Sequence, residues 1–84
     1  NTGNQTFYVP ITVEIKTRVG AIADLITVFS NMRINIGELN GKDMDGGNSR
    51  YHIAASVNSA EQLELLMNRL RRVNGVSEVQ REHE

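Results

Sequence analysis

The segment best suited to chemistry is a glycine turn that joins an alternating apolar stretch to a helical pattern. Its residues are Arg18, Val19 and Gly20, followed by Ala21 and Ile22. A strand that passes through a glycine directly into a helix presents the first free N–H groups of that helix at the turn. Those groups carry partial positive charge, so the turn is suited to hold a carboxylate or another small anion.

The elements that position this turn follow from the spacing of the apolar residues. Alternation over Phe7–Lys16 predicts a strand with one covered and one exposed face. Apolar residues three and four positions apart predict a helix over Ala21–Met32, and a second strand is expected over Arg33–Leu39. Turn-forming residues fill Asn40–Asn48, so we expect a hairpin with a long, mobile tip and a third strand over Ser49–Val57.

The remaining pattern completes a small sandwich. Ser59 and Gln62 match a capping box, which predicts a second helix that Asn74 and Gly75 end, and a fourth strand is expected over Val76–Arg81. Right-handed crossovers then give a four-stranded antiparallel sheet in the order 4-1-3-2, with both helices on one face. The predicted fold class is therefore α+β, a ferredoxin-like βαββαβ sandwich.

Composition indicates a single small domain. The chain has 84 residues, 39% of them hydrophobic and 23% charged, with a formal net charge of -1, so no long-range attraction to nucleic acid or an anionic membrane is expected. There is no cysteine, which excludes disulfides and thiol chemistry. Because no apolar run could span a membrane and no signal-peptide pattern is present, the cytoplasm is the expected location. Pairing with a second copy would stabilise so small a core.

The expected boundaries follow from the first and last strands. The strand pattern begins at Phe7, so residues 1–6 are expected to be a linker or an expression remnant. Residues 7–81 form the predicted domain. Residues 82–84, Glu82-His83-Glu84, are expected to be a solvated, charged tail.

No metal or cofactor site is expected. Asp43 and Asp45 begin like a calcium loop, but Ala54 occupies the position where a bidentate glutamate belongs. His52 and His83 are the only histidines, and His83 belongs to the charged tail, so a metal site built on them is not expected.

Two other modules share the strand order. Acylphosphatase pairs an arginine of the first turn with an asparagine of a neighbouring strand, and Arg18 and Asn35 resemble that pair, but only Gly20 of the glycine-rich turn is present. RNA-recognition modules stack bases on aromatic residues of the third strand. Here that strand carries Arg50 and His52 on its expected wet face, without the aromatic pair, so neither activity is favoured.

Three segments of the chain resemble the ACT domain, a small ligand-sensing module of this fold. They are Arg18–Ile26, Arg33–Ile36 and Val73–Arg81, and the resemblance spans residues 9–81. It is closest to the carboxy-terminal ACT domain of RelA/SpoT-type enzymes, the (p)ppGpp synthetase/hydrolases also called GTP pyrophosphokinases. The resemblance implies a non-catalytic regulatory domain that forms a homodimer and controls the catalytic domains of a parent enzyme.

The resemblance also implies a ligand site between two copies, with an amino acid held by the first turn of one copy and the second strand of its neighbour. One wall would be formed by Arg18, Val19, Gly20, Ala21 and Ile22, and the other by Asn35 and Ile36. Apolar Val19 and Ile22 favour a branched-chain amino acid.

A ligand-free docking module of the same enzyme is the alternative. Three basic residues, Arg69, Arg71 and Arg72, lie near the end of the second predicted helix and could contact a protein or ribosomal RNA. Cations at a helix C-terminus also complement the helix dipole, so a structural role accounts for them equally well.

Overall fold

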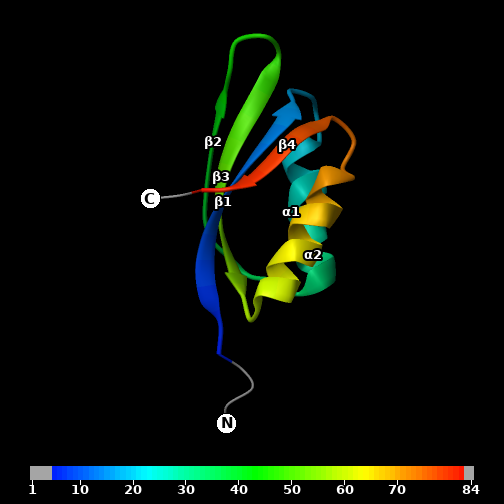
Figure 1. Ribbon diagram of the computed structural model, residues 1–84. Helices are drawn as coiled ribbons and strands as arrows, with labels where there is room; N and C mark the ends of the chain where they lie inside the picture. Colours follow the sequence, from blue (N-terminus) through cyan, green and yellow to red (C-terminus); the bar gives the residue numbers. More distant parts are fainter. Residues whose placement is uncertain (1–4, 83–84) are drawn as a thin grey trace.

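The computed structural model describes residues 5–82 and contains the expected order of elements (Figure 1). The strands are β1 (Phe7–Lys16), β2 (Ile36–Asp43), β3 (Asn48–Val57) and β4 (Val76–Arg81), and the helices are α1 (Ala21–Met32) and α2 (Ala60–Arg71). The strands form one antiparallel sheet in the order β2-β3-β1-β4, and both helices cover the same face. This confirms the ferredoxin-like prediction. Within the described part of the chain, no helix is long and apolar enough to cross a membrane.

The core forms because β1 alternates strictly between a buried and an accessible face. Val9, Ile11, Val13 and Ile15 are each at most 2% exposed. Side chains from both helices pack on that face of the sheet; those buried most deeply are Leu25, Phe29, Leu66 and Leu70. The alternate residues of β1 lie on the other face of the sheet, which neither α1 nor α2 covers (Figure 1).

Strand β2 begins later and ends later than the sequence pattern predicts. Arg33 has a left-handed conformation, with φ 58°, and its backbone N–H donates to Ser30 O at 3.1 Å, so it closes α1 instead of opening a strand. Asn35 lies just before β2, and its carbonyl accepts from Ser56 N at 2.9 Å. Because residues 40–43 pair with β3, the predicted long hairpin tip is wrong, and the turn occupies only residues 44–47.

Both tyrosines of the chain cover glycines of β2. A Cβ atom added to Gly37 would clash with the ring of Tyr8, and one added to Gly41 would clash with the ring of Tyr51. Tyr8 projects from the uncovered face of the sheet, whereas Tyr51 pairs with the buried Val13 and lies on the helix-covered face. The edge strand is thus packed from both faces at its two glycines.

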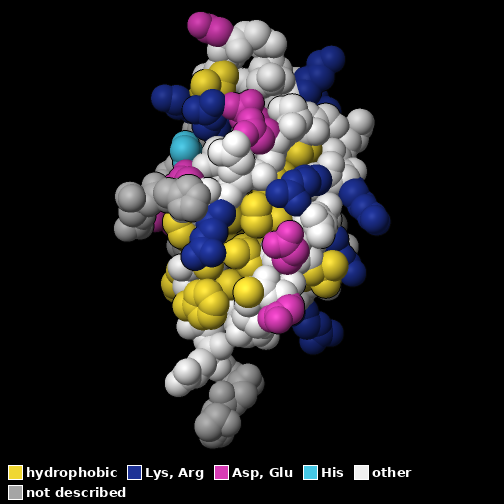
Figure 2. All heavy atoms as spheres, viewed as in Figure 1, with side chains coloured by type: hydrophobic (Ala, Val, Ile, Leu, Met, Phe, Trp, Pro, Cys, Tyr) yellow, Lys and Arg dark blue, Asp and Glu magenta, His cyan; other side chains and the backbone are white. Residues whose placement is uncertain are grey.

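Strand β4 is short, so it leaves part of β1 uncovered. It pairs with β1 only from Ile11 onward, and Pro10 lies where this ladder ends. Pro10 has no N–H to leave unpaired, and its carbonyl accepts from Glu82 N at 2.9 Å. Figure 2 shows hydrophobic side chains gathered on the lower half of this side, and Phe7, the first residue of β1, is 51% exposed.

The start of α2 provides a test of the fold. Ser59 Oγ accepts from Gln62 N at 3.0 Å, while Gln62 Oε1 accepts from Asn58 N at 2.7 Å. We expect Ser59→Ala to lower the free energy of unfolding by about 1 kcal/mol, and Ser59→Gly by only a few tenths, because glycine also suits this cap position. Urea unfolding measures both values. No measurable loss in Ser59→Ala would show that the Ser59 hydroxyl does not cap α2.

Candidate functional site

The predicted turn is built around Gly20. This residue has a left-handed conformation with φ 86°, precedes α1 and provides no side-chain cap. Gly20 O accepts from Asp24 N at 2.9 Å, and Arg18 O accepts from Ala21 N at 3.2 Å. No acceptor within residues 5–82 takes the backbone N–H groups of Ile22 and Ala23. The start of α1 therefore offers two free donors in the partially positive field of the helix terminus.

Arg18 holds this turn in place. Its Nη2 donates to Asp24 Oδ2 at 2.9 Å and to Asn74 O at 2.8 Å, so the guanidinium joins the turn to α1 and to the loop before β4. Its Nε is buried and has no partner in the described part of the chain. Arg18 is therefore mainly committed to internal contacts.

The other residues of this wall have different surroundings. Val19 is fully exposed, Ile22 is partly buried, and Ala21 is 3% exposed because its side chain belongs to the core. Only Val19 and Ile22 can therefore offer apolar side-chain surface to a ligand.

The two predicted walls lie at opposite ends of the chain's own fold. The turn precedes α1, whereas Asn35 and Ile36 follow it, and a helix of 12 residues is about 18 Å long. Figure 1 shows the turn at the upper end and the start of β2 at the lower end. One chain therefore does not bring the walls together. For the same reason, Arg18 and Asn35 do not form an acylphosphatase-like pair within a chain.

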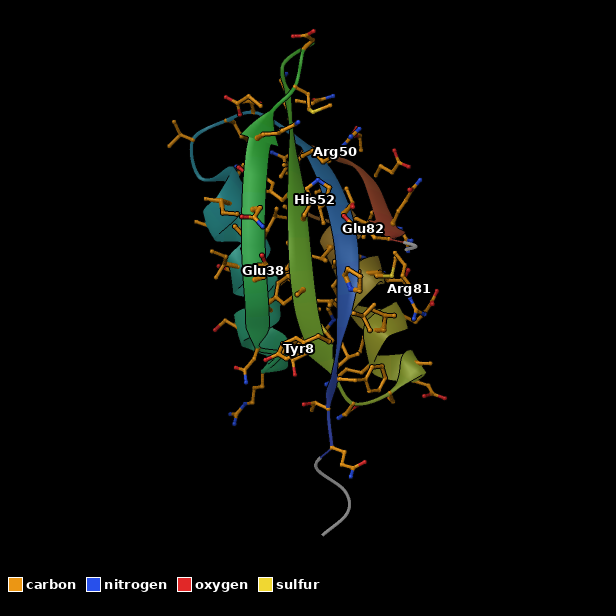
Figure 3. The ribbon with its side chains drawn as sticks, turned by 90° about the vertical axis from the view of Figure 1, so that its left-hand side faces the viewer. Tyr8, Glu38, Arg50, His52, Arg81 and Glu82 are labelled. Carbon is orange, nitrogen blue, oxygen red and sulfur yellow. The ribbon has the colours of Figure 1, made fainter. Side chains whose placement is uncertain are left out.

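A polar cluster on the uncovered face of the sheet is the second candidate site (Figure 3). Thr12 Oγ1 donates to Glu82 Oε2 at 2.6 Å, and Glu82 Oε2 also contacts His52 Nδ1. Nearby, Arg50 Nε donates to Glu14 Oε2 at 3.0 Å. These groups surround a hollow of about 340 Å³. Its lining residues are Thr12, Glu14, Arg50, His52, Glu78, Gln80 and Glu82.

Glu82 was expected to be part of a solvated tail, and the structure instead holds it against the sheet. The hydrogen bond from Thr12 and then the contact with His52 lower the pKa of the Glu82 carboxyl below its usual value. His83 lies outside the described residues. Within residues 5–82, no group of three or more His, Cys, Asp or Glu side chains could hold a metal ion.

Sequence reasoning missed the role of Glu82 because its partners are remote in the chain. Thr12 is 70 positions away and His52 is 30 positions away. Only the pairing of β3, β1 and β4 brings the three together, so no local pattern could identify the cluster.

One protein family model matches almost the whole chain. The model of the ACT domain family matches residues 3–81. The chain therefore belongs to the ACT domain family. Comparison with curated protein sequences gives no significant match.

Solved structures share the fold across almost the whole chain. The crystal structure of the ACT domain from GTP pyrophosphokinase of Chlorobium tepidum superimposes with a TM-score of 0.79 at 24% identity, covering 93% of this chain and 100% of that chain. The C-terminal domain of the MgtC protein from Mycobacterium tuberculosis gives 0.72 at 17% identity, covering 98% and 89%. A homoserine dehydrogenase from Thiobacillus denitrificans gives 0.68 at 14% identity, covering 89% of this chain but 17% of that chain. These likenesses establish the fold.

The Glu82 contacts predict a pH dependence of stability. Because the pKa of Glu82 is lower in the folded chain than its ordinary value of 4.5, its contacts stabilise the fold fully above that ordinary value. That contribution is lost as the pH falls through the lowered value. Between about pH 6 and about pH 3, we expect the wild type to lose more stability than Glu82→Gln, as measured by urea unfolding.

The matched control is Glu64→Gln, on the exposed side of α2, which should change stability with pH as the wild type does. If the curves of Glu82→Gln and wild type ran parallel, Glu82 would be no more than a solvated carboxylate.

Proposed function

We propose that this chain is the non-catalytic regulatory ACT domain of a cytoplasmic (p)ppGpp synthetase/hydrolase, a GTP pyrophosphokinase. It would bind a small amino acid between two copies. The arrangement of the ligand-bound copies would then control the catalytic domains of the parent enzyme. Membership of the ACT domain family supports a regulatory role, and the likeness to the ACT domain from a GTP pyrophosphokinase supports the parent enzyme. The observation that carries the site is the pair of free N–H groups of Ile22 and Ala23 at the start of α1.

Geometry supports a site shared between copies. Strand β2 lies at the edge of the sheet, and α1 lies behind it on the same side (Figure 3). Ile26 of α1 is 43% exposed, which leaves apolar surface for a partner. Antiparallel pairing of two β2 strands about a two-fold axis would place the start of one β2 beside the end of the other. Asn35 and Ile36 of one copy would then approach the glycine turn of its partner.

The groups at this junction match the two ends of an amino acid. The free N–H groups of Ile22 and Ala23 suit its carboxylate, and the side-chain oxygen of Asn35 can accept from its ammonium group. Val19 and Ile22 supply apolar surface for a branched side chain. Regulation further requires two states of the dimer that bind this ligand with different affinity.

An amide-resolved NMR titration tests the site. With valine, isoleucine, leucine and (p)ppGpp as separate titrants, we expect one aliphatic amino acid to cause saturable shifts. The shifts should cluster at the amides of Gly20, Ala21, Ile22, Ala23, Asn35 and Ile36. A flat response to every titrant, with the dimer intact, would contradict the ligand site.

Valine substitutions at two glycines with positive φ test whether the ligand binds at the Gly20 turn. Gly20→Val should weaken binding by roughly tenfold or more, because valine disfavours a φ of 86° and distorts the start of α1. Gly46→Val is the matched control, because Gly46 has φ 90°, lies in the hairpin turn and has open space around it. Calorimetric titration should show unchanged affinity for this control. Equal affinity of both variants would place the ligand elsewhere.

The docking alternative predicts a different result. Arg71 is engaged within the chain, since its Nη1 donates to Asn68 Oδ1 at 2.8 Å and its Nη2 donates to Val79 O at 3.2 Å. Arg69 and Arg72 are exposed. RNA binding that falls steeply with salt and weakens in Arg69→Ala with Arg72→Ala would favour the docking module.

A further inference from the structure

The helix-covered side of the β2 edge carries one anion and one cation that form no ion pair within residues 5–82. Asp43 ends β2, and its register with the buried Ser49 places its side chain on the helix-covered face. The other charged residues of β2, Glu38 and Lys42, lie on the uncovered face. The cation is Arg33, which lies between α1 and β2 and is exposed.

Arg33 has a backbone conformation that arginine does not favour. It ends α1 with φ 58°, at a position where glycine is the usual residue because it has no Cβ atom. Asp24 is the one charged residue within α1, and it is already paired with Arg18 at the other end of the helix. Arg33 is thus available to an anion from another chain.

The two charges lie at opposite ends of the β2 edge, since Arg33 precedes the strand and Asp43 is its last residue. Antiparallel pairing of two β2 strands has a two-fold axis perpendicular to the sheet. This axis exchanges the two ends of the edge and keeps the helices of both copies on the same side. It therefore brings Arg33 of each copy toward Asp43 of the other.

Asp43 is also the outer end of a hydroxyl relay, formed by Thr17, Ser49 and Asp43, that leads to the Gly20 turn. Ser49 Oγ donates to Asp43 Oδ1 at 2.9 Å and lies 2.6 Å from Thr17 Oγ1. Because a hydroxyl has one proton and a carboxylate only accepts, Thr17 is the donor in the second bond. Ser49 is 2% exposed, so this polar group is buried and fully used by its two partners.

Thr17 attaches the turn to the β2–β3 hairpin. Its backbone N–H donates to Gly47 O at 2.8 Å, and Arg18 follows it directly in the chain. While Asp43 accepts from Ser49, the donors run in order from Thr17 to Ser49 to Asp43. If Asp43 turns away, Ser49 can donate to Thr17 instead, so the relay has two discrete arrangements.

We propose that Arg33 of each copy binds Asp43 of the other copy across the β2 edge, and that the relay carries this contact to the Gly20 turn. This inference rests on the proposed function and adds its regulation. The ion pair holds the Asp43 carboxylate on Ser49, which keeps Thr17 as a donor and the turn in its ligand-binding position. Pairing of copies then raises the affinity of the turn for its ligand, and the ligand strengthens the pairing by the same factor.

Charge reversal tests the ion pair by sedimentation equilibrium at low salt. Arg33→Glu and Asp43→Lys should each weaken dimerisation about tenfold, because each homodimer then has two repulsions in place of two attractions. An equimolar mixture of the two variants should restore the wild-type affinity, since both pairs in the mixed dimer have opposite charges. The matched controls are Arg81→Glu, at the opposite edge of the sheet, and Asp45→Lys, in the hairpin turn, which should dimerise as the wild type does.

The relay is tested by NMR without ligand, at a concentration at which the chain is monomeric. Asp43→Ala should shift the amide resonances of Gly20 and Ala21 in the wild type and in Thr17→Ser, which keeps the hydroxyl. It should not shift them in Thr17→Val, which has the same shape without the hydroxyl. The control background is Thr12→Val, which removes a hydroxyl of β1 on the uncovered face and should leave the shifts as in the wild type.

Each result decides one part of the proposal. A monomeric wild type, single variants that dimerise as the wild type does, or a mixture no tighter than either variant alone would overturn the ion pair. Equal shifts in Thr17→Ser and Thr17→Val, or none in the wild type, would overturn the relay. Neither experiment contains an amino acid, so a flat amino-acid titration would contradict the proposed ligand site without changing these results.

Discussion

The alternation of β1 is the constraint on which the rest of the molecule depends. The strand lies between β3 and β4, and every second side chain of β1 is buried beneath the helices. A shift of one residue would move that entire set to the uncovered face, so the core specifies the register strongly. The same register aligns Thr12 with His52 and Glu14 with Arg50. The same strand register therefore determines both which side chains form the core and which form the polar cluster.

The crossover through α1 imposes a second constraint, because the segments that precede and follow the helix are held a full helix length apart. A strand-helix-strand unit sets the turn before the helix and the segment after it at opposite ends of the sheet. In this chain those segments are the Gly20 turn and the start of β2 at Asn35 and Ile36. Any site that uses both must draw them from different copies. A ligand there would therefore respond to how copies are arranged, which is the property a regulatory domain needs.

The order of the elements and both helices could be predicted from the sequence, because apolar periodicity is a local signal. The capping pair Ser59 and Gln62 was predictable for the same reason. The bounds of β2 were not, since turn-forming residues at 40–43 are held extended by pairing with β3. The glycine turn could be recognised from its local pattern. The anchoring of Glu82 could not, because it depends on contacts across three strands.

The placement of the two tyrosines has a spectroscopic consequence. The chain contains no tryptophan, so Tyr8 and Tyr51 dominate its near-ultraviolet absorption and emission. Each ring lies against a glycine of the same edge strand, one from each face of the sheet. The intrinsic optical signal is therefore concentrated around β2. Changes at that edge can be followed in the unlabelled protein, with Tyr8 sensing the uncovered face and Tyr51 the side toward the helices.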